Sequence, residues 1–325
     1  MMERSRQILE KFESTSTSGI HQPELLSILG EVRAYWQDTF RPALASFSCE
    51  AVGGKPDAVD DVILMITLMG AGLGIHDDII DCSINKHFRA TILGLHGIDD
   101  ALLVGDLFIV KALIMVREIV KKSLSPELIE KVIDLFENFF LEVWEGEFLE
   151  TRCRRNLETE LELCKKILWM STADTEACTK LGAILGKGTE VEVETLSEVG
   201  RRLGYLFRLA DEVKDTLNLE GNLQSRLENE SVPLPILHSA QSSPKAKLVI
   251  NKILTKPRIS SSAFTTVMQF CLETDSFNYV LNLAKVNEAE ALCRIESLKK
   301  SEATNALVLL VRNAFDRVAY LCLDV

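Results

Sequence analysis

Proline is scarce in this chain of 325 residues, which has 8 prolines and none between Pro126 and Pro233. All-β folds need frequent turns, and turns are commonly marked by proline and glycine. A proline-free stretch of more than 100 residues therefore argues against a β-sandwich or barrel. It favours long helices instead.

Closely spaced cysteine pairs and a long apolar run are also lacking. The 8 cysteines are scattered from Cys49 to Cys322 with no CxxC pair, which indicates reduced thiols rather than a zinc site or a disulfide framework. The first residues, MMERSRQILEKFES, are charged and have no signal-peptide core. The most apolar run, residues 62–75, has 14 residues and is too short to span a bilayer. We expect a cytoplasmic protein that is not an integral membrane protein.

An excess of basic residues is missing as well. Lys and Arg number 36 against 48 Asp and Glu, giving a net charge of −12 and a pI of about 5.1. Nucleic-acid binding needs a basic face, so we expect no nucleic-acid partner. Self-repulsion of the negative charge favours solubility.

Helical periodicity is present instead. Leu25, Ile28, Leu29 and Val32 repeat at steps of three and four, and residues 129–140 do the same. Residues 158–186 and 197–219 indicate two further long helices, and later prolines bound shorter ones. No repeat, linker or clear strand interrupts the pattern. The prediction is an all-α fold of roughly ten to twelve helices in a single domain over residues 1–325.

One predicted helix is not amphipathic. Residues 62–75, VILMITLMGAGLGI, are apolar on every face. Such a helix is either fully buried or lines an apolar cavity.

Three carboxylates follow that helix directly, in the segment HDDIID. Asp77 and Asp81 are four residues apart and share a helical face, with Asp78 beside them. Their mutual repulsion would be relieved by a divalent cation, and oxygen ligands suit Mg²⁺. The alternative is an acidic helix end in solvent.

A second pair, Asp211 and Asp215, has the same spacing 134 positions later, since 211 − 77 is 134. Two acidic clusters on two apolar helices are suited to holding metal ions that bind a diphosphate and help it leave. The apolar helix would provide a pocket for an attached hydrocarbon.

Five ordered segments now resemble the trans-isoprenyl diphosphate synthase (polyprenyl synthetase) family. They are FRPALASFSCEAVGG, HDDIID, ALLVGDLFIVKAL with Gly105-Asp106, LGAILG, and GYLFRLADEVKD. The resemblance implies a helical bundle around a central cavity, and either a homodimer or a heteromer with a related subunit.

The resemblance also implies a reaction. Mg²⁺ ions bind an allylic diphosphate between the two aspartate motifs, diphosphate departs, isopentenyl diphosphate attacks the allylic cation, and a proton is lost. By this resemblance Asp77, Asp81 and Asp211 are direct, catalytic metal ligands. Asp78 and Asp215 act through water or as outer partners.

The chain departs from the family pattern at its basic residues. In the family, a basic segment binds isopentenyl diphosphate. That segment falls on WQDT, residues 36–39, in this chain, and Arg41 is the only basic residue that remains from it. A like-signed carboxylate at Asp38 would repel a diphosphate by about 4 kcal/mol per contact at 4 Å and an effective dielectric of about 20. The later lysine-threonine motif falls near residues 170–172, which contain no lysine, and few basic residues occur in 226–235.

Candidate substrate contacts remain. Lys86 and His87 lie where the family has an arginine pair, Arg89 follows them, and Phe207-Arg208 precede the second motif. These five residues and Arg41 are the candidates for binding the substrates.

Gly72 and Leu73 lie one turn before the first motif, where bulky residues in the family close the substrate tunnel. A small residue at 72 predicts a medium or long product. Close helix packing is the other interpretation of this glycine.

The main hypothesis is a Mg²⁺-dependent trans-prenyltransferase that condenses an allylic diphosphate with isopentenyl diphosphate. The alternatives are a substrate-binding or regulatory subunit of a heteromeric synthase, a class I terpene cyclase or diphosphate lyase, and a helical interaction protein with vestigial acids.

Overall fold

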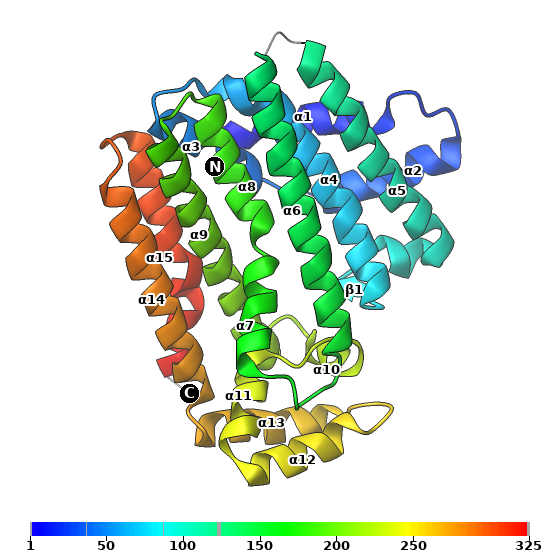
Figure 1. Ribbon diagram of the computed structural model, residues 1–325. Helices are drawn as coiled ribbons and strands as arrows, with labels where there is room; N and C mark the ends of the chain where they lie inside the picture. The colour runs from blue at the N-terminus through cyan, green and yellow to red at the C-terminus, as the bar shows by residue number, and fades with distance from the viewer. Residues whose placement is uncertain (1, 37, 87, 122–124, 324–325) are drawn as a thin grey trace. The chain divides into compact units, whose positions relative to one another are not determined.

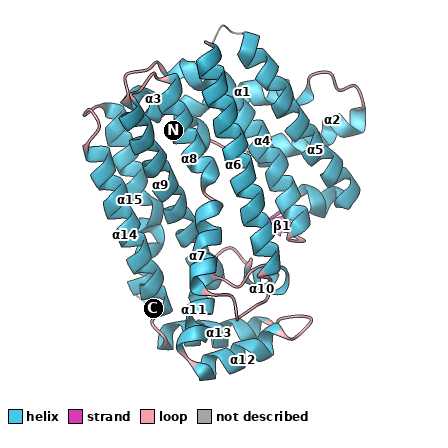
Figure 2. Ribbon diagram, in the orientation of Figure 1, coloured by secondary structure: helices cyan, strands magenta, loops and turns pink. Residues whose placement is uncertain are grey.

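The computed structural model describes residues 2–36, 38–86, 88–121 and 125–323, and most of these are helical (Figures 1 and 2). They form fifteen α-helices, one 3₁₀ helix and one two-stranded antiparallel hairpin. The elements in chain order are α1 (Met2–Thr17), α2 (Pro23–Tyr35), α3 (Phe40–Ala51), η1 (Pro56–Val59), α4 (Asp60–Ile80), β1 (Asn85–Lys86), β2 (Arg89–Ala90), α5 (Ile92–Lys121), α6 (Pro126–Arg152), α7 (Leu161–Met170), α8 (Ala173–Leu185), α9 (Glu190–Thr216), α10 (Leu223–Asn229), α11 (Leu234–Ser242), α12 (Pro244–Leu254), α13 (Ser261–Glu273), α14 (Ser276–Glu296) and α15 (Glu302–Leu323). The all-α prediction is confirmed.

The number of helices exceeds the predicted ten to twelve, in part because residues 158–186 form two helices, α7 and α8. The helix is interrupted at Ser171 and Thr172. Their hydroxyls donate to the carbonyls of Leu168 (2.9 Å) and Trp169 (2.7 Å). Such side-chain bonds to the backbone compete with helix continuation. The helix predicted from residue 197 begins earlier, at Glu190.

The chain divides into two compact units. Unit 1 contains Met1–Glu137, Ala177–Ser197 and Glu296–Leu307, and unit 2 contains Asn138–Glu176, Glu198–Ile295 and Val308–Val325. Helices α6, α8, α9, α14 and α15 contribute residues to both. A single domain over the whole chain, enclosing a central cavity, stays a prediction.

Helix α4 is the core helix of unit 1. Residues 62–69 are buried without interruption, and Ile63 and Leu68 have no exposed surface. By length and composition, residues 56–80 could cross a membrane, but 67% of the most apolar window is buried inside the protein. This is the pattern of a core helix, and it agrees with the first interpretation of the all-apolar segment.

Helices α4 and α5 lie side by side in unit 1 (Figure 1), and Gly72 is one of their contact points. A Cβ atom at Gly72 would lie 2.7 Å from the carbonyl oxygen of Gly105 and 2.8 Å from Cγ1 of Ile109. Gly72 therefore faces α5, as the close-packing interpretation requires. Its role at the floor of a substrate tunnel stays a prediction.

Replacing Gly72 by alanine is expected to lower the free energy of unfolding by about 1–3 kcal/mol, because the added methyl group overpacks the contact with the α5 backbone. Urea denaturation measures the change. Gly30 in α2 is the matched control, since a Cβ there meets nothing within 4 Å. Gly30→Ala should stabilise the helix by up to about 1 kcal/mol. Equal effects at both glycines would contradict this packing role.

The LGAILG segment packs on α3 in the same manner. A Cβ atom at Gly182 would clash with the Ala45 carbonyl oxygen, and one at Gly186 would lie 2.7 Å from that of Cys49. The small residues of this segment therefore allow α8 to approach the α3 backbone.

In unit 2, side chains from α7 and α14 pack on α9 two to three turns before its second acidic cluster. The rings of Trp169 and Tyr205 pack edge to face, with their centroids 5.3 Å apart. Arg202 donates to Asn287 Oδ1 at 3.1 Å and also pairs with Glu290. These contacts pack α9 against α7 and α14.

Candidate active site

The first acidic cluster lies at the C-terminal end of α4 in unit 1. Asp77 and Asp78 belong to the last helical turn, and Asp81 is the residue that ends the helix. The negative end of the helix dipole adds to the carboxylate charge there. A nearby cation is therefore strongly favoured.

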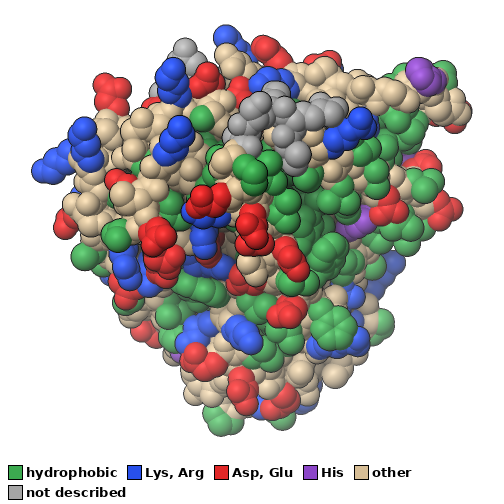
Figure 3. Space-filling model, turned by 45° about the horizontal axis from the view of Figure 1, so that its top comes forward, with side chains coloured by type: hydrophobic (Ala, Val, Ile, Leu, Met, Phe, Trp, Pro, Cys, Tyr) green, Lys and Arg blue, Asp and Glu red, His purple; other side chains and the backbone are tan. Residues whose placement is uncertain are grey.

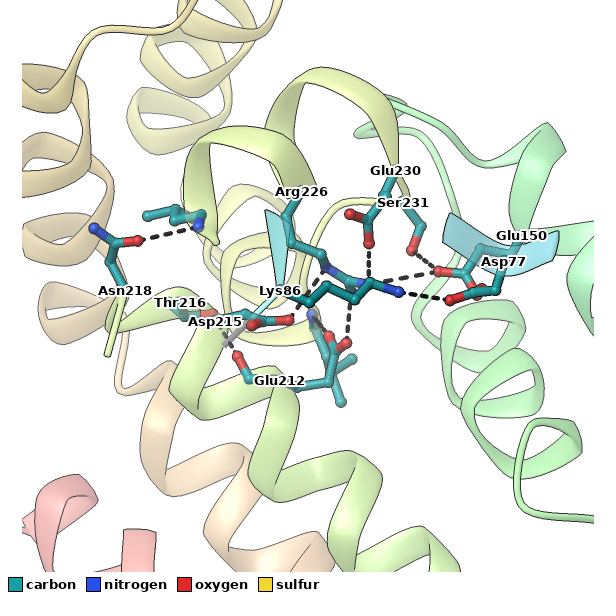
Figure 4. A network of polar contacts seen from close by, with 12 residues as sticks. Asp77, Lys86, Glu150, Glu212, Asp215, Thr216, Asn218, Arg226, Glu230 and Ser231 are labelled. Carbon is teal, nitrogen blue, oxygen red and sulfur yellow. Dashed lines mark hydrogen bonds and ion pairs between the residues drawn. The ribbon is translucent and has the colours of Figure 1, made fainter. Parts of the chain in front are cut away.

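Lys86 provides that cation. The β1–β2 hairpin returns the chain toward α4, and Lys86 Nζ lies 2.7 Å from Asp77 Oδ2 and 2.8 Å from Asp78 Oδ1. Figure 4 shows the Lys86 side chain extended toward Asp77. Thr91 fixes the base of the hairpin by donating to the carbonyl of Ser83 at 2.6 Å.

Burial shapes the protonation of this cluster. Asp78 is 6% exposed, and its burial raises the pKa of the carboxyl, although Lys86 works in the opposite direction. Burial tends to lower the pKa of Lys86, but Asp77 and Asp78 raise it above the usual lysine range. The ammonium group therefore stays charged at neutral pH.

The Gly105-Asp106 pair of α5 lies against His76, the residue before the first cluster. A Cβ atom at Gly105 would clash with the His76 ring, so the glycine allows the ring to approach α5. His76 Nε2 is 3.3 Å from Asp106 Oδ1. The glycine-aspartate segment thus packs on the helix end that carries the acids.

The second acidic cluster lies in the last turns of α9, in unit 2. Asp211 is 49% exposed and pairs with Lys214 at 2.8 Å. Asp215 is 17% exposed and lies 3.4 Å from Arg226 Nε. Burial raises the pKa of Asp215 to about 7, with Arg226 opposing the shift and neighbouring carboxylates adding to it.

Arg226 is the centre of a buried network in unit 2 (Figure 4). Its guanidinium pairs with Glu212 and Glu230 at 2.7 Å each and lies 3.8 Å from Glu150. Glu212 also accepts a hydrogen bond from the Leu234 N–H. Glu212, the second acid of this motif, is therefore used within the fold.

Arg208 lies one turn before Asp211 on α9. Burial tends to lower its pKa, but Glu150 and Asp211 raise it above the usual range. Among the described residues, the buried Arg208 Nε–H has no hydrogen-bond partner. Phe207 beside it is half-buried.

Asp38 has a role that the sequence interpretation missed. Its Oδ1 accepts hydrogen bonds from the N–H groups of Phe40 (3.0 Å) and Arg41 (3.2 Å), which start α3. Its Oδ2 pairs with Arg41 Nη1 at 2.9 Å. Asp38 lies one position before Thr39, the N-cap residue of α3, and caps the first N–H groups of the helix through an Asx-type turn. Such a turn is a local signal of aspartate, so this role could have been recognised. Arg41, the remaining basic residue of the segment, is thus engaged by Asp38.

Trp36, at the start of the same loop, packs on α4. A Cβ at Gly74 would lie 2.8 Å from the indole ring, and one at Gly70 would lie 3.4 Å from it. The indole therefore fills space one turn before the first acidic cluster.

The remaining candidates are dispersed. Arg89 is exposed on β2, and Leu73 is half-buried on α4. Met170 and Thr172, where the family's lysine-threonine motif falls, are buried at the α7–α8 break. His87 lies outside the described residues. Sequence reasoning also missed Glu150 and Glu230, for which no local pattern gave a signal.

The donor set of the first cluster suits a metal ion. Two carboxylate oxygens from different residues converge on one cationic nitrogen within 2.8 Å. Oxygen donors that already meet at a single cation fit a hard divalent ion such as Mg²⁺. Within the described residues, no three His, Cys, Asp or Glu side chains are assembled as a ready metal site.

Solved structures define the fold class as that of the isoprenyl diphosphate synthases. Geranylgeranyl pyrophosphate synthetase from Pyrococcus horikoshii superposes with a TM-score of 0.84 at 24% identity, covering 97% of this chain and 96% of that one. Decaprenyl diphosphate synthase from Rhodobacter capsulatus superposes with a TM-score of 0.86 at 18% identity, covering 98% of this chain and 97% of that one.

Sequence comparison identifies the family. The polyprenyl synthetase family matches residues 38–270, so the chain belongs to this family of trans-prenyltransferases. The short chain isoprenyl diphosphate synthase of Methanothermobacter thermautotrophicus is 32% identical over 184 residues, 56% of this chain and 55% of that protein. The octaprenyl diphosphate synthase of Haemophilus influenzae is 26% identical over 282 residues, 85% and 83% of the two chains. The resemblance inferred from the five motifs is confirmed.

Proposed function

We propose that this chain is a Mg²⁺-dependent trans-prenyltransferase that condenses an allylic diphosphate with isopentenyl diphosphate to give a longer polyprenyl diphosphate. The observation that carries the proposal is the convergence of Asp77 and Asp78 on one cation at the end of a buried apolar helix. Membership of the polyprenyl synthetase family supports the same chemistry.

The roles of the residues are assigned from their chemistry and from the resemblance to the family. Asp77, Asp81 and Asp211 would hold Mg²⁺ directly, with Asp78 and Asp215 as outer partners. Bound Mg²⁺ supplies positive charge for the diphosphate as the allylic C–O bond breaks. Arg208 adds a fixed cation one turn before Asp211. The apolar surface of α4, including Leu73, would keep water from the allylic cation.

A specific observation favours a second candidate, a subunit of a heteromeric synthase. Arg41 is engaged by Asp38 and Lys86 by Asp77 and Asp78. Two of the cations expected to hold isopentenyl diphosphate are therefore neutralised within the chain. A related subunit could supply the missing basic residues.

Product analysis separates these candidates. The purified protein is incubated with Mg²⁺ and an allylic diphosphate, with and without isopentenyl diphosphate, and the products are extracted. Longer diphosphates support the proposal. Hydrocarbons or alcohols formed without isopentenyl diphosphate indicate a lyase or cyclase instead. Activity that begins only when a related subunit is added indicates the heteromer.

Asp38→Asn is expected to raise kcat/KM for isopentenyl diphosphate about tenfold, the equivalent of one part-buried ion pair. The amide oxygen can still cap α3, because asparagine caps about as well as aspartate, while Arg41 is released from its carboxylate. The value for the allylic diphosphate should stay unchanged. Steady-state kinetics with each substrate varied separately measure both.

The exposed acid Asp57 in η1 is the matched control, and Asp57→Asn should change neither constant. An unchanged kcat/KM for isopentenyl diphosphate in Asp38→Asn would show that Arg41 does not serve this substrate. Asp38→Lys is a poorer test, since it also removes the α3 cap.

We also propose that the protein is cytoplasmic and assembles with a second copy or a related subunit. Helix α5 carries large apolar side chains that are between 47% and 65% exposed. They are Leu95, Ile98, Leu102, Leu103, Val110, Leu113 and Ile114. Hydrophobic side chains gather on the right of Figure 3, the side on which α5 lies in Figure 1. Light scattering that gives 36.3 kDa at every concentration would contradict self-association.

A further inference from the structure

The acids of the first cluster were expected to need a divalent ion to relieve their repulsion, yet the chain already provides a counter-charge. Lys86 Nζ lies 2.7 Å from Asp77 and 2.8 Å from Asp78, both within hydrogen-bond distance. The ammonium group thus occupies the position at which these two carboxylates can share a cation.

The surroundings make this contact strong. Lys86 is 28% exposed and Asp78 6% exposed, so the charges are partly removed from water. Coulomb interactions increase as the effective dielectric falls. A divalent ion on the same carboxylate oxygens would lie within a few ångströms of the ammonium, and two cations at that distance repel each other. The ion and the ammonium therefore exclude each other from these oxygens.

The hairpin allows the lysine to leave without rearranging the backbone. Its base is fixed by the Thr91 hydroxyl on the Ser83 carbonyl (2.6 Å) and by the Thr91 N–H on the Ile84 carbonyl (3.0 Å). Lysine carries its charge on a flexible four-carbon stem. Rotation of the side chain alone can therefore move the ammonium away from α4.

We propose that Lys86 is an internal counter-cation that competes with the divalent metal ion for Asp77 and Asp78, and that metal binding releases its ammonium group. The inference rests on the proposed function, because it takes Asp77 as a direct ligand of the metal ion and Asp78 as its outer partner. In the metal-free protein Lys86 keeps the acidic helix end stable. In the metal-bound protein the released ammonium is free to meet an anionic ligand.

Metal binding without substrate tests the competition. Mn²⁺ is titrated calorimetrically into the full-length wild-type protein and into Lys86→Gln, Lys86→Arg and Lys11→Gln. We expect Lys86→Gln to bind Mn²⁺ about tenfold more tightly, since one cationic competitor is removed. Lys86→Arg keeps the charge and should bind as the wild type does.

Lys11→Gln is the matched control. Lys11 Nζ pairs with Asp60 Oδ2 at 2.8 Å at the other end of the same helix, so its loss changes net charge equally without touching the first cluster. Its Mn²⁺ affinity should equal that of the wild type. A thermal scan adds a second readout: metal-free Lys86→Gln should melt below the wild type, and Mn²⁺ should raise its Tm by more.

Equal Mn²⁺ affinity in wild type and Lys86→Gln, with binding lost in Asp77→Ala, would overturn the competition and leave the metal site of the proposed function in place. Absence of Mn²⁺ binding in all variants would overturn both. If Lys11→Gln binds Mn²⁺ more tightly than Lys86→Gln does, the change in affinity comes from net charge alone, and the inference is also overturned.

Discussion

Asp77→Ala is expected to lower kcat/KM for the allylic diphosphate by roughly 10³-fold, the usual scale for removing one group that stabilises leaving-group charge. The fold should persist. Asp77 is 35% exposed, and Lys86 keeps Asp78 as a partner when Asp77 is lost. Removing one carboxylate also relieves repulsion within the cluster. Kinetics and circular dichroism on the same sample measure the two effects.

Asp60→Ala is the control for this variant, because it removes an aspartate with a lysine partner from the opposite end of α4. It should leave turnover within about twofold of wild type, as expected for a change remote from the reacting atoms. Asp211→Ala should behave as Asp77→Ala does if both clusters serve the same diphosphate. Wild-type turnover in Asp77→Ala would exclude the first cluster from the reaction.

Arg226→Met is expected to lower the free energy of unfolding by about 3–5 kcal/mol, the cost of removing one partner from a buried charge network. Four carboxylates lose their shared cation: Glu150, Glu212, Asp215 and Glu230. Methionine preserves much of the volume, so the loss reports charge rather than a cavity. Chemical denaturation followed by circular dichroism is the measurement.

Two further variants serve as controls for Arg226→Met. Glu230→Gln removes one of several partners while Arg226 retains the others, so it should cost about 1 kcal/mol or less, as for a single net hydrogen bond. Arg258→Met replaces an exposed arginine of unit 2 and should change stability by less than about 0.5 kcal/mol. Similar losses in Arg226→Met and Arg258→Met would show that the network does not stabilise the fold.

Asp38 shows that a local sequence pattern can predict a helix cap and can also be misinterpreted. From the sequence, Asp38 was interpreted as a charge that repels diphosphate. In the structure it starts α3 and holds Arg41 through contacts two and three residues away. Both interactions are local, so capping rules could have predicted them. The family pattern indicates only that position 38 has lost a basic residue, and not what the aspartate does there.

Gly72 was ambiguous for a different reason. The sequence allowed either an open tunnel or close packing, because glycine has no side chain to indicate a direction. Only the placement of α5, with the Gly105 carbonyl 2.7 Å from the position of a Cβ, shows which neighbour Gly72 faces.

The sequence by itself determined the helical class, the all-apolar character of α4, the order of the five family motifs and the positions of both acidic clusters. These follow from spacing over a few residues, and helices are specified by such short periods. The tertiary structure decided which cation meets each acid. Lys86 reaches Asp77 across 9 positions through a hairpin, and Arg226 reaches Glu212 across 14 positions through a loop and α10. Ion pairs of this kind depend on where the backbone turns back, and no local pattern of side chains specifies that.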